Sequence, residues 1–185
     1  MPTFTIILFA AIGAIFLYFI VIYNTLIARK NHVDESWSDI DVQLKRRYDL
    51  IPNLIETVKA FAKHESTVFE TVTKARAEAM QAKTLSEHTA AEGMLSRALG
   101  NIVAVAENYP ELKSSVNFLQ LQDELKDAED KIQAARRFYN SNVRDFNITI
   151  QQFPQNIFAK SLGFKPADYF ELENTTERSL PKVSF

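Results

Sequence analysis

The sequence predicts an all-α protein: an N-terminal transmembrane helix, then an antiparallel up-and-down bundle of the four-helix type, with a partly irregular C-terminal tail. Three observations lead to this prediction. The 4 Gly and 6 Pro make only 10 of 185 residues, which disfavours turn-rich β-sandwiches and barrels. An uncharged run near the N-terminus is long enough to span a bilayer. Apolar residues then recur every three or four positions. We divide the chain into an anchor (1–28), a helical bundle (29–160) and a tail (161–185).

The overall composition narrows the class of protein further. With 46% hydrophobic and 24% charged residues the chain is expected to fold. Its formal net charge of -2 gives no electrostatic drive toward nucleic acid, so no nucleic-acid partner is expected. The absence of Cys excludes disulfides, a thiol nucleophile and Cys-based metal sites.

The predicted anchor is the uncharged run from Phe4 to Tyr23. A helix of that length spans about 30 Å, the thickness of the hydrocarbon core. A cleaved signal peptide is the alternative, but no Lys or Arg precedes the run and the run is too long. The residues expected in the lipid or at its interfaces are Phe4, Ile7, Phe16, Tyr18 and Tyr23.

Basic residues on one side of this run set the expected orientation. Arg29 and Lys30 follow the run directly, whereas no basic side chain precedes it, so the bundle is expected in the cytoplasm, with the N-terminus on the other side of the membrane. Arg46 and Arg47 come soon after, and all four residues are candidates for contact with lipid headgroups. A solvated helix face of mixed charge is the alternative for Arg46 and Arg47, because three Asp residues lie near them.

The first bundle helix raises the question of continuity. An apolar series from Val33 through Leu44 continues in register to Ile51, which would suit one unbroken helix from the membrane. Pro52 argues against that, because proline inside a helix costs about 3 kcal/mol. We therefore predict a break or sharp kink at Pro52, with Asp49 as the cap of a second helix that runs to Ala79.

The remaining helices follow from their caps and apolar series. Thr84 and Glu87 have the spacing of a capping box and begin a third helix that runs to Tyr109. A long fourth helix is predicted from a cap at Asn108 with Pro110 in its first turn, and Pro154 would end it. The tail is expected to dock on this bundle or on a neighbour through its aromatic residues, which are Phe164, Tyr169, Phe170 and Phe185.

Motifs of known catalytic chemistry do not match. His64 and Glu65 begin like a zinc-protease helix, but Val68 stands where the second His is required. The chain also lacks the Glu-x-x-His pairs of a di-iron bundle, a phosphate-binding glycine loop and a nucleophile elbow. We therefore expect no enzyme, no bound metal and no cofactor.

Several stretches closely resemble the LemA family of bacterial single-pass membrane proteins. They are residues 23–24, 37–54, 62–65, 106–113, 136–140, 143–147, 153–154, 163–165 and 181–185. The resemblance covers nearly the whole chain. It implies a single N-terminal span, a helical bundle and a cytoplasmic body. It implies no catalytic activity, because the family has no agreed biochemical role.

The resemblance also carries over polar residues on the helix faces. We expect Glu65 to lie in a bundle seam, paired with Arg136 or Arg137 of the last helix, since a buried carboxylate needs a partner. These residues either set helix register, or are exposed, or form with Trp37 a surface for further copies or a partner. The other candidates are Gln43, Asn53, Tyr139, Asn140, Arg144 and Asn147.

Three functions are compatible with the sequence. The leading hypothesis is a membrane-anchored scaffold that acts by self-assembly, as a homo-oligomer, or by holding partners at the inner membrane. The second is an accessory subunit of an envelope quality-control system such as a membrane zinc protease. The third is a hydrolase with an unrecognised carboxylate site.

Overall fold

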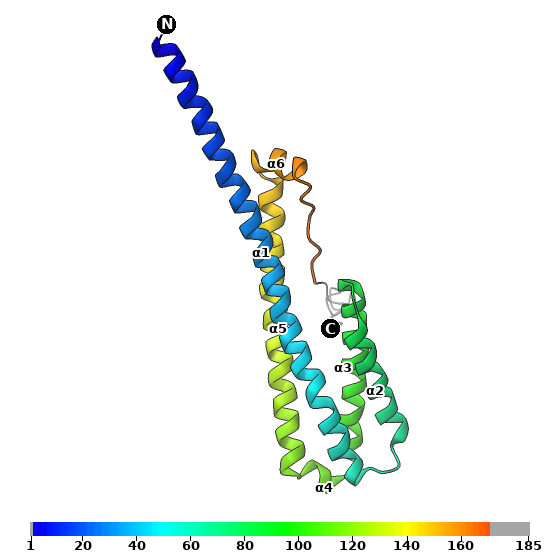
Figure 1. The fold of residues 1–185 in the computed structure, drawn as a ribbon. Helices are drawn as coiled ribbons and strands as arrows, with labels where there is room; N and C mark the ends of the chain where they lie inside the picture. Colours follow the sequence, from blue (N-terminus) through cyan, green and yellow to red (C-terminus); the bar gives the residue numbers. More distant parts are fainter. Residues whose placement is uncertain (1, 171–185) are drawn as a thin grey trace, which may run out of the picture. The chain divides into compact units, whose positions relative to one another are not determined.

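The computed structural model describes residues 2–170, and every regular element in this range is a helix. The helices are α1 (Pro2–Phe61), α2 (Ser66–Gln81), α3 (Leu85–Glu107), α4 (Pro110–Lys113), α5 (Val116–Gln151) and α6 (Gln155–Ser161) (Figure 1). The predicted all-α fold class is confirmed.

The chain forms two compact units. Unit 1 combines the residues up to Asp39 with Ala135–Tyr169, and unit 2 contains Ile40–Ala134 together with Phe170. Helices α1 and α5 contribute to both units, since each is continuous across the boundary.

In unit 1, the first part of α1 packs antiparallel to the last part of α5. Contacts join Trp37 to Tyr139, His32 to Asn142 and Arg29 to Asp145, so residue numbers fall along α1 as they rise along α5. The shared core is apolar and belongs to helix faces with the three-to-four spacing that the sequence shows. Its buried residues include Ile22, Leu26, Val33, Tyr139, Val143, Phe146 and Ile150.

Residues 161–169 of the tail belong to unit 1 and dock on its helices. Gly163 has a positive φ of 78° and ends α6, because the Phe164 N–H then donates to the Ala159 carbonyl over 2.9 Å. The Phe164 ring lies 6.2 Å from that of Phe146. Docking on the chain's own bundle is thus observed for the part of the tail that is described, and Phe185 lies outside the described residues.

In unit 2, α2 and α3 form a helical hairpin (Figure 1). The predicted capping box is confirmed: the Thr84 hydroxyl accepts from the Glu87 N–H over 3.2 Å, and Glu87 Oε2 accepts from the Thr84 N–H over 3.1 Å. The core of this unit includes Ile40, Leu44, Ile51, Val58, Val72, Leu95, Ile102 and Ile132.

The predicted break at Pro52 is wrong, since α1 continues through Pro52 to Phe61. A proline cannot donate to the carbonyl four residues earlier, which here belongs to Tyr48. Arg76 of α2 supplies the missing donor, because its Nε donates to the Tyr48 carbonyl over 2.8 Å. The chain breaks later, in a turn at residues 62–65, so the second predicted helix is divided between α1 and α2.

The predicted start of the last helix is also wrong. Asn108 is the C-cap of α3, and Tyr109 is the N-cap of the short α4, where Pro110 does occupy the first turn. Helix α5 begins only at Val116. The predicted end holds, because α5 stops at Gln151, shortly before Pro154.

The described residues contain one helix long and apolar enough to cross a membrane, which is α1. Almost none of its uncharged run is covered by the rest of the described chain. Exposed side chains in the run include all the predicted anchor residues, Phe4, Ile7, Phe16, Tyr18 and Tyr23. This exposure suits a lipid environment and would be unfavourable in water.

Candidate functional site

The candidate site is an open groove of about 460 Å³ in unit 2, between α3 and α5 with α1 at its base. We call it the α3–α5 groove. Its lining residues are Arg47, Leu54, Ser96, Leu99, Gly100, Val103, Gln122, Leu125, Lys126 and Glu129.

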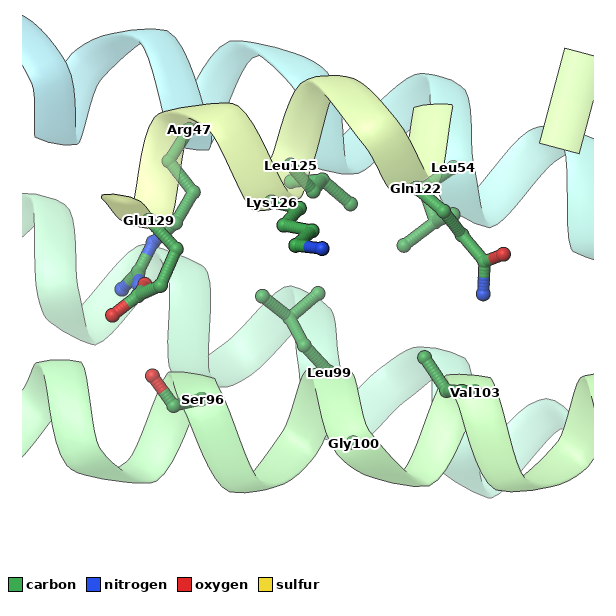
Figure 2. A pocket seen from close by; sticks show the side chains of 10 residues that line it. All are labelled: Arg47, Leu54, Ser96, Leu99, Gly100, Val103, Gln122, Leu125, Lys126 and Glu129. Atoms are coloured by element: carbon green, nitrogen blue, oxygen red, sulfur yellow. The ribbon is translucent and has the colours of Figure 1, made fainter. Parts of the chain in front are cut away.

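The walls of the α3–α5 groove are mainly aliphatic. Figure 2 shows Leu54, Leu99 and Leu125 directed into the space between the helices. Leu54 is fully buried beneath the groove, whereas Val103 is 43% exposed at its edge. Leu125 of α5 is half-buried. The groove therefore offers apolar side chains that the described residues leave uncovered.

Gly100 lies on the groove wall in the middle of α3 (Figure 2). A Cβ atom built at this position would meet nothing within 4 Å. Gly costs roughly 0.5–1 kcal/mol relative to Ala inside a helix, so its presence here is not explained by local helix stability. The missing side chain widens the groove at this turn of α3.

A buried ion cluster closes one end of the groove. The Arg47 side chain is 3% exposed and its Nη1 donates to Glu129 over 2.5 Å. Its Nη2 donates to Oε2 of Glu92, and the Tyr48 hydroxyl donates to Oε1 of the same carboxylate. Both oxygens of Glu92 thus have hydrogen-bond partners, as buried polar side chains generally do.

Two of the predicted site residues are misplaced. Arg47 does not face lipid headgroups: it is buried in the ion cluster. Glu65 does not lie in a helix seam, because it is the half-buried N-cap residue of α2, in the turn after α1. The expected ion pair of Glu65 with Arg136 or Arg137 depended on burial of Glu65 in a seam, and that condition is not met. A buried Arg–Glu pair does exist, but between Arg47 and Glu92.

The sequence held a signal for this pair. Arg47 continues the apolar series of Leu44 and Ile51, and Glu92 stands three residues before Leu95 in α3. A charged residue at a seam position in each of two helices indicates a buried pair. The sequence indicated less about Gly100. An isolated Gly in a helix lowers helix stability and can reflect close packing, but it does not by itself indicate a groove.

The remaining candidates do not form one continuous stripe. In unit 1, Trp37 packs edge-on against Tyr139 at 5.6 Å between ring centroids. The Tyr139 hydroxyl donates to the Asp168 carbonyl, and the pKa of this phenol is raised by burial first and then by Asp168 and Asp34. Asn147 clamps the tail, because its side chain donates to the carbonyl and accepts from the N–H of Ala167.

The other polar candidates are less deeply placed. Arg137 and Arg144 are exposed, while Arg136 and Asn140 are half-buried. In unit 2, Asn53 is exposed and Gln43 is half-buried. Three candidate headgroup contacts remain accessible, each in an ion pair: Arg29 with Asp145, Lys30 with Asp34, and Arg46 with Asp127.

Acidic and histidine side chains do not gather into a metal site in residues 2–170. No group of three or more His, Asp or Glu side chains lies close enough to hold an ion in that range.

The fold and the site define a class: a membrane-associated helical protein whose body carries an open apolar groove beside a buried ion cluster. The LemA family model matches residues 36–185, and the chain belongs to the LemA family. The chain is 27% identical to "Magnetosome protein MamQ 2" of Paramagnetospirillum magneticum and 25% identical to "Magnetosome protein MamQ" of Magnetospirillum gryphiswaldense, over 80% of its length in each case. It covers 64% of the length of each of these relatives. It is also 24% identical to "Protein LemA" of Metamycoplasma hominis, over 86% of this chain and 74% of that protein.

Proposed function

We propose that this protein is a membrane-anchored scaffold, with its body in the cytoplasm, that holds another polypeptide at the inner membrane. The α3–α5 groove is the proposed contact surface, and its occupant is an apolar helical segment of a partner or of a further copy. The single observation that carries the proposal is the row of uncovered aliphatic side chains along the groove.

The dimensions of the α3–α5 groove favour a helix as occupant. Its lining residues extend from Ser96 to Val103 on α3 and from Gln122 to Glu129 on α5, a rise of seven residues along each helix. At 1.5 Å per residue this is a length of about 10 Å, or two helical turns. Apolar residues at positions i, i+3 or i+4, and i+7 of a bound helix would reach such a groove.

The charges of the groove support a binding role over a catalytic one. A general acid or base needs a proton-transfer atom that is available to a substrate. In Glu92 both oxygens already accept from Arg47 and Tyr48, and Glu129 accepts from Arg47. Lys126 and Gln122 also line the groove, where they would give polar contacts beside its apolar side chains.

The proposal is tested with a large and a small side chain at Gly100 in the full-length protein. Gly100→Trp should fill the groove, and Gly100→Ala is the matched control that adds only a methyl group. Each variant is solubilised in a mild detergent, and its mass and co-purifying proteins are determined. We expect wild type and the Ala variant to keep the same assembly and the Trp variant to lose it.

The outcomes separate the alternatives. Loss of mass without loss of a second protein would assign the groove to self-assembly. Loss of a co-purifying membrane zinc protease would favour the accessory-subunit function. An unchanged assembly in the Trp variant, with its helical content preserved, would contradict the proposal.

A further inference from the structure

The end of unit 1 that carries α6 lies against the membrane run of α1. The Phe158 ring of α6 contacts the Phe19 ring edge to face, with 5.2 Å between centroids. Ile22 and Leu26, just beyond Phe19, are buried. Figure 1 shows α6 beside α1 at the end of α5. The body of the protein therefore reaches the last turn of the apolar run.

The position of Phe19 gives the depth of this contact. Phe19 is four residues before Tyr23, the end of the uncharged run, so it lies about 6 Å inside that end along the helix axis. Residues 4–23 are needed to cross a hydrocarbon core of about 30 Å. A helix that touches Phe19 is then held at the boundary between acyl chains and headgroups.

The same end of unit 1 exposes large apolar side chains. Phe153 is 79% exposed, Ile157 is 58% exposed and Leu162 is 42% exposed. All three lie on α6 or within two residues of its ends. In water these side chains would be unfavourable, whereas in the bilayer interface each gains from leaving water.

The charges around α6 suit an anionic membrane surface. Residues 146–167 contain no Asp or Glu, and Lys160 and Lys165 are both exposed. The two lysines border a hollow of about 520 Å³ on this end of the unit. A lysine near an anionic bilayer contributes about 1 kcal/mol of attraction.

We propose that α6 and its flanking residues form a second membrane contact, which lies in the interface next to the transmembrane part of α1. In it Phe153, Ile157 and Leu162 enter the lipid, and Lys160 and Lys165 meet phosphate groups. The inference rests on the proposed function only in taking α1 as the anchor. A second copy fits this surface less well, because a stable protein interface needs about 800 Å² per partner and three side chains do not supply it.

The test uses the absence of Cys in this chain. Single cysteines replace Ile157, Phe9 or Phe138 in the full-length protein, and each is labelled with bimane. The protein is reconstituted in vesicles of phosphatidylethanolamine and phosphatidylglycerol that contain a lipid with a nitroxide on its acyl chain. Phe9 lies within the apolar run. Phe138 is the matched control, since it is exposed on α5, 13 residues before the helix ends at Gln151 and thus about 20 Å from that end.

We expect strong quenching of the label at residues 9 and 157, with a blue-shifted emission, and none at residue 138. Quenching at residue 9 without quenching at residue 157 would overturn the inference and leave the anchor intact. A blue shift at residue 157 without quenching would also overturn it, because that result places the side chain against protein. An unquenched label at residue 9 would instead reject the anchor, and with it the proposed function.

Discussion

Arg76 of α2 donates a hydrogen bond from Nε to the backbone carbonyl of Tyr48 in α1, over 2.8 Å. This carbonyl is the acceptor that a residue other than proline at position 52 would have used. The contact explains how α1 contains Pro52 without ending there, and it ties α2 to α1 at a point where the helix ladder lacks a bond.

The first prediction follows from this relationship. Arg76→Met keeps most of the aliphatic chain but removes the donor, which should cost about 1–3 kcal/mol because a part-buried carbonyl is left without a partner. Pro52→Ala restores the N–H of α1, so Arg76→Met should cost at least about 1 kcal/mol less in that background. Urea unfolding followed by circular dichroism in detergent gives the four free energies. Arg97→Met, at an exposed arginine of α3, is the control and should change little. Equal costs in both backgrounds would mean that the Arg76 bond does not compensate for the proline.

The second prediction concerns the buried ion cluster. Glu92→Ala should lower the free energy of unfolding by about 3 kcal/mol, because it leaves Arg47 buried with only the half-exposed Glu129 as partner. Glu129→Ala should cost only about 1 kcal/mol, since that pair is partly solvated. The double variant Arg47→Met with Glu92→Leu should be more stable than Glu92→Ala. Urea unfolding measures the free energy of unfolding of each variant. A double variant less stable than Glu92→Ala would contradict the prediction.

The third prediction is a pH dependence at the start of α3. The Lys83 and Thr84 N–H groups donate to Glu87, and they hold the pKa of its carboxyl below the ordinary value of 4.5. As the pH falls, the unfolded chain takes up its proton first. The stabilisation is therefore complete above pH 4.5 and is lost as the pH falls through the lower, folded pKa.

Glu87→Gln provides the comparison for this pH dependence, since Gln can accept the same hydrogen bonds but does not titrate. Wild type should be the more stable protein at pH 7, and its advantage should shrink as the pH is lowered below the ordinary carboxyl pKa of 4.5. Thermal unfolding of both proteins across this range measures the difference. If the stabilities of the two proteins change with pH in parallel, the Glu87 carboxylate contributes no pH-dependent stabilisation.

The fourth prediction concerns topology. Arg29 and Lys30 follow the uncharged run, so the bundle should be cytoplasmic and the N-terminus outside. In cells with an intact inner membrane, an impermeant maleimide should leave Ser184→Cys unlabelled and should label Thr3→Cys. Breaching the membrane should make the first variant reactive. Labelling of Ser184→Cys before the breach would reverse the assignment.

Features set by local interactions could be predicted from the sequence. The apolar run of α1 is defined by composition and length alone, and the Thr84–Glu87 capping box needs only residues three apart. The helix faces follow from the period of the apolar residues, which is why Ile40, Ile102 and Ile132 are all buried. Pro154 marked the end of α5 for the same kind of reason, since it cannot continue a helix.

Features that depend on a distant partner were decided only by the tertiary structure. Proline disfavours a helix interior, but Arg76, 28 residues past Tyr48, offsets the lost bond. From the sequence, Arg47 was expected to contact lipid headgroups. In the fold it is buried and paired with Glu92, which lies 45 residues later in the chain. The α3–α5 groove is lined by residues of three helices that are far apart in the sequence, and packing sets the distance between helices. Sequence periodicity determines which face of each helix is apolar, whereas only the assembled fold determines which part of that face is left uncovered.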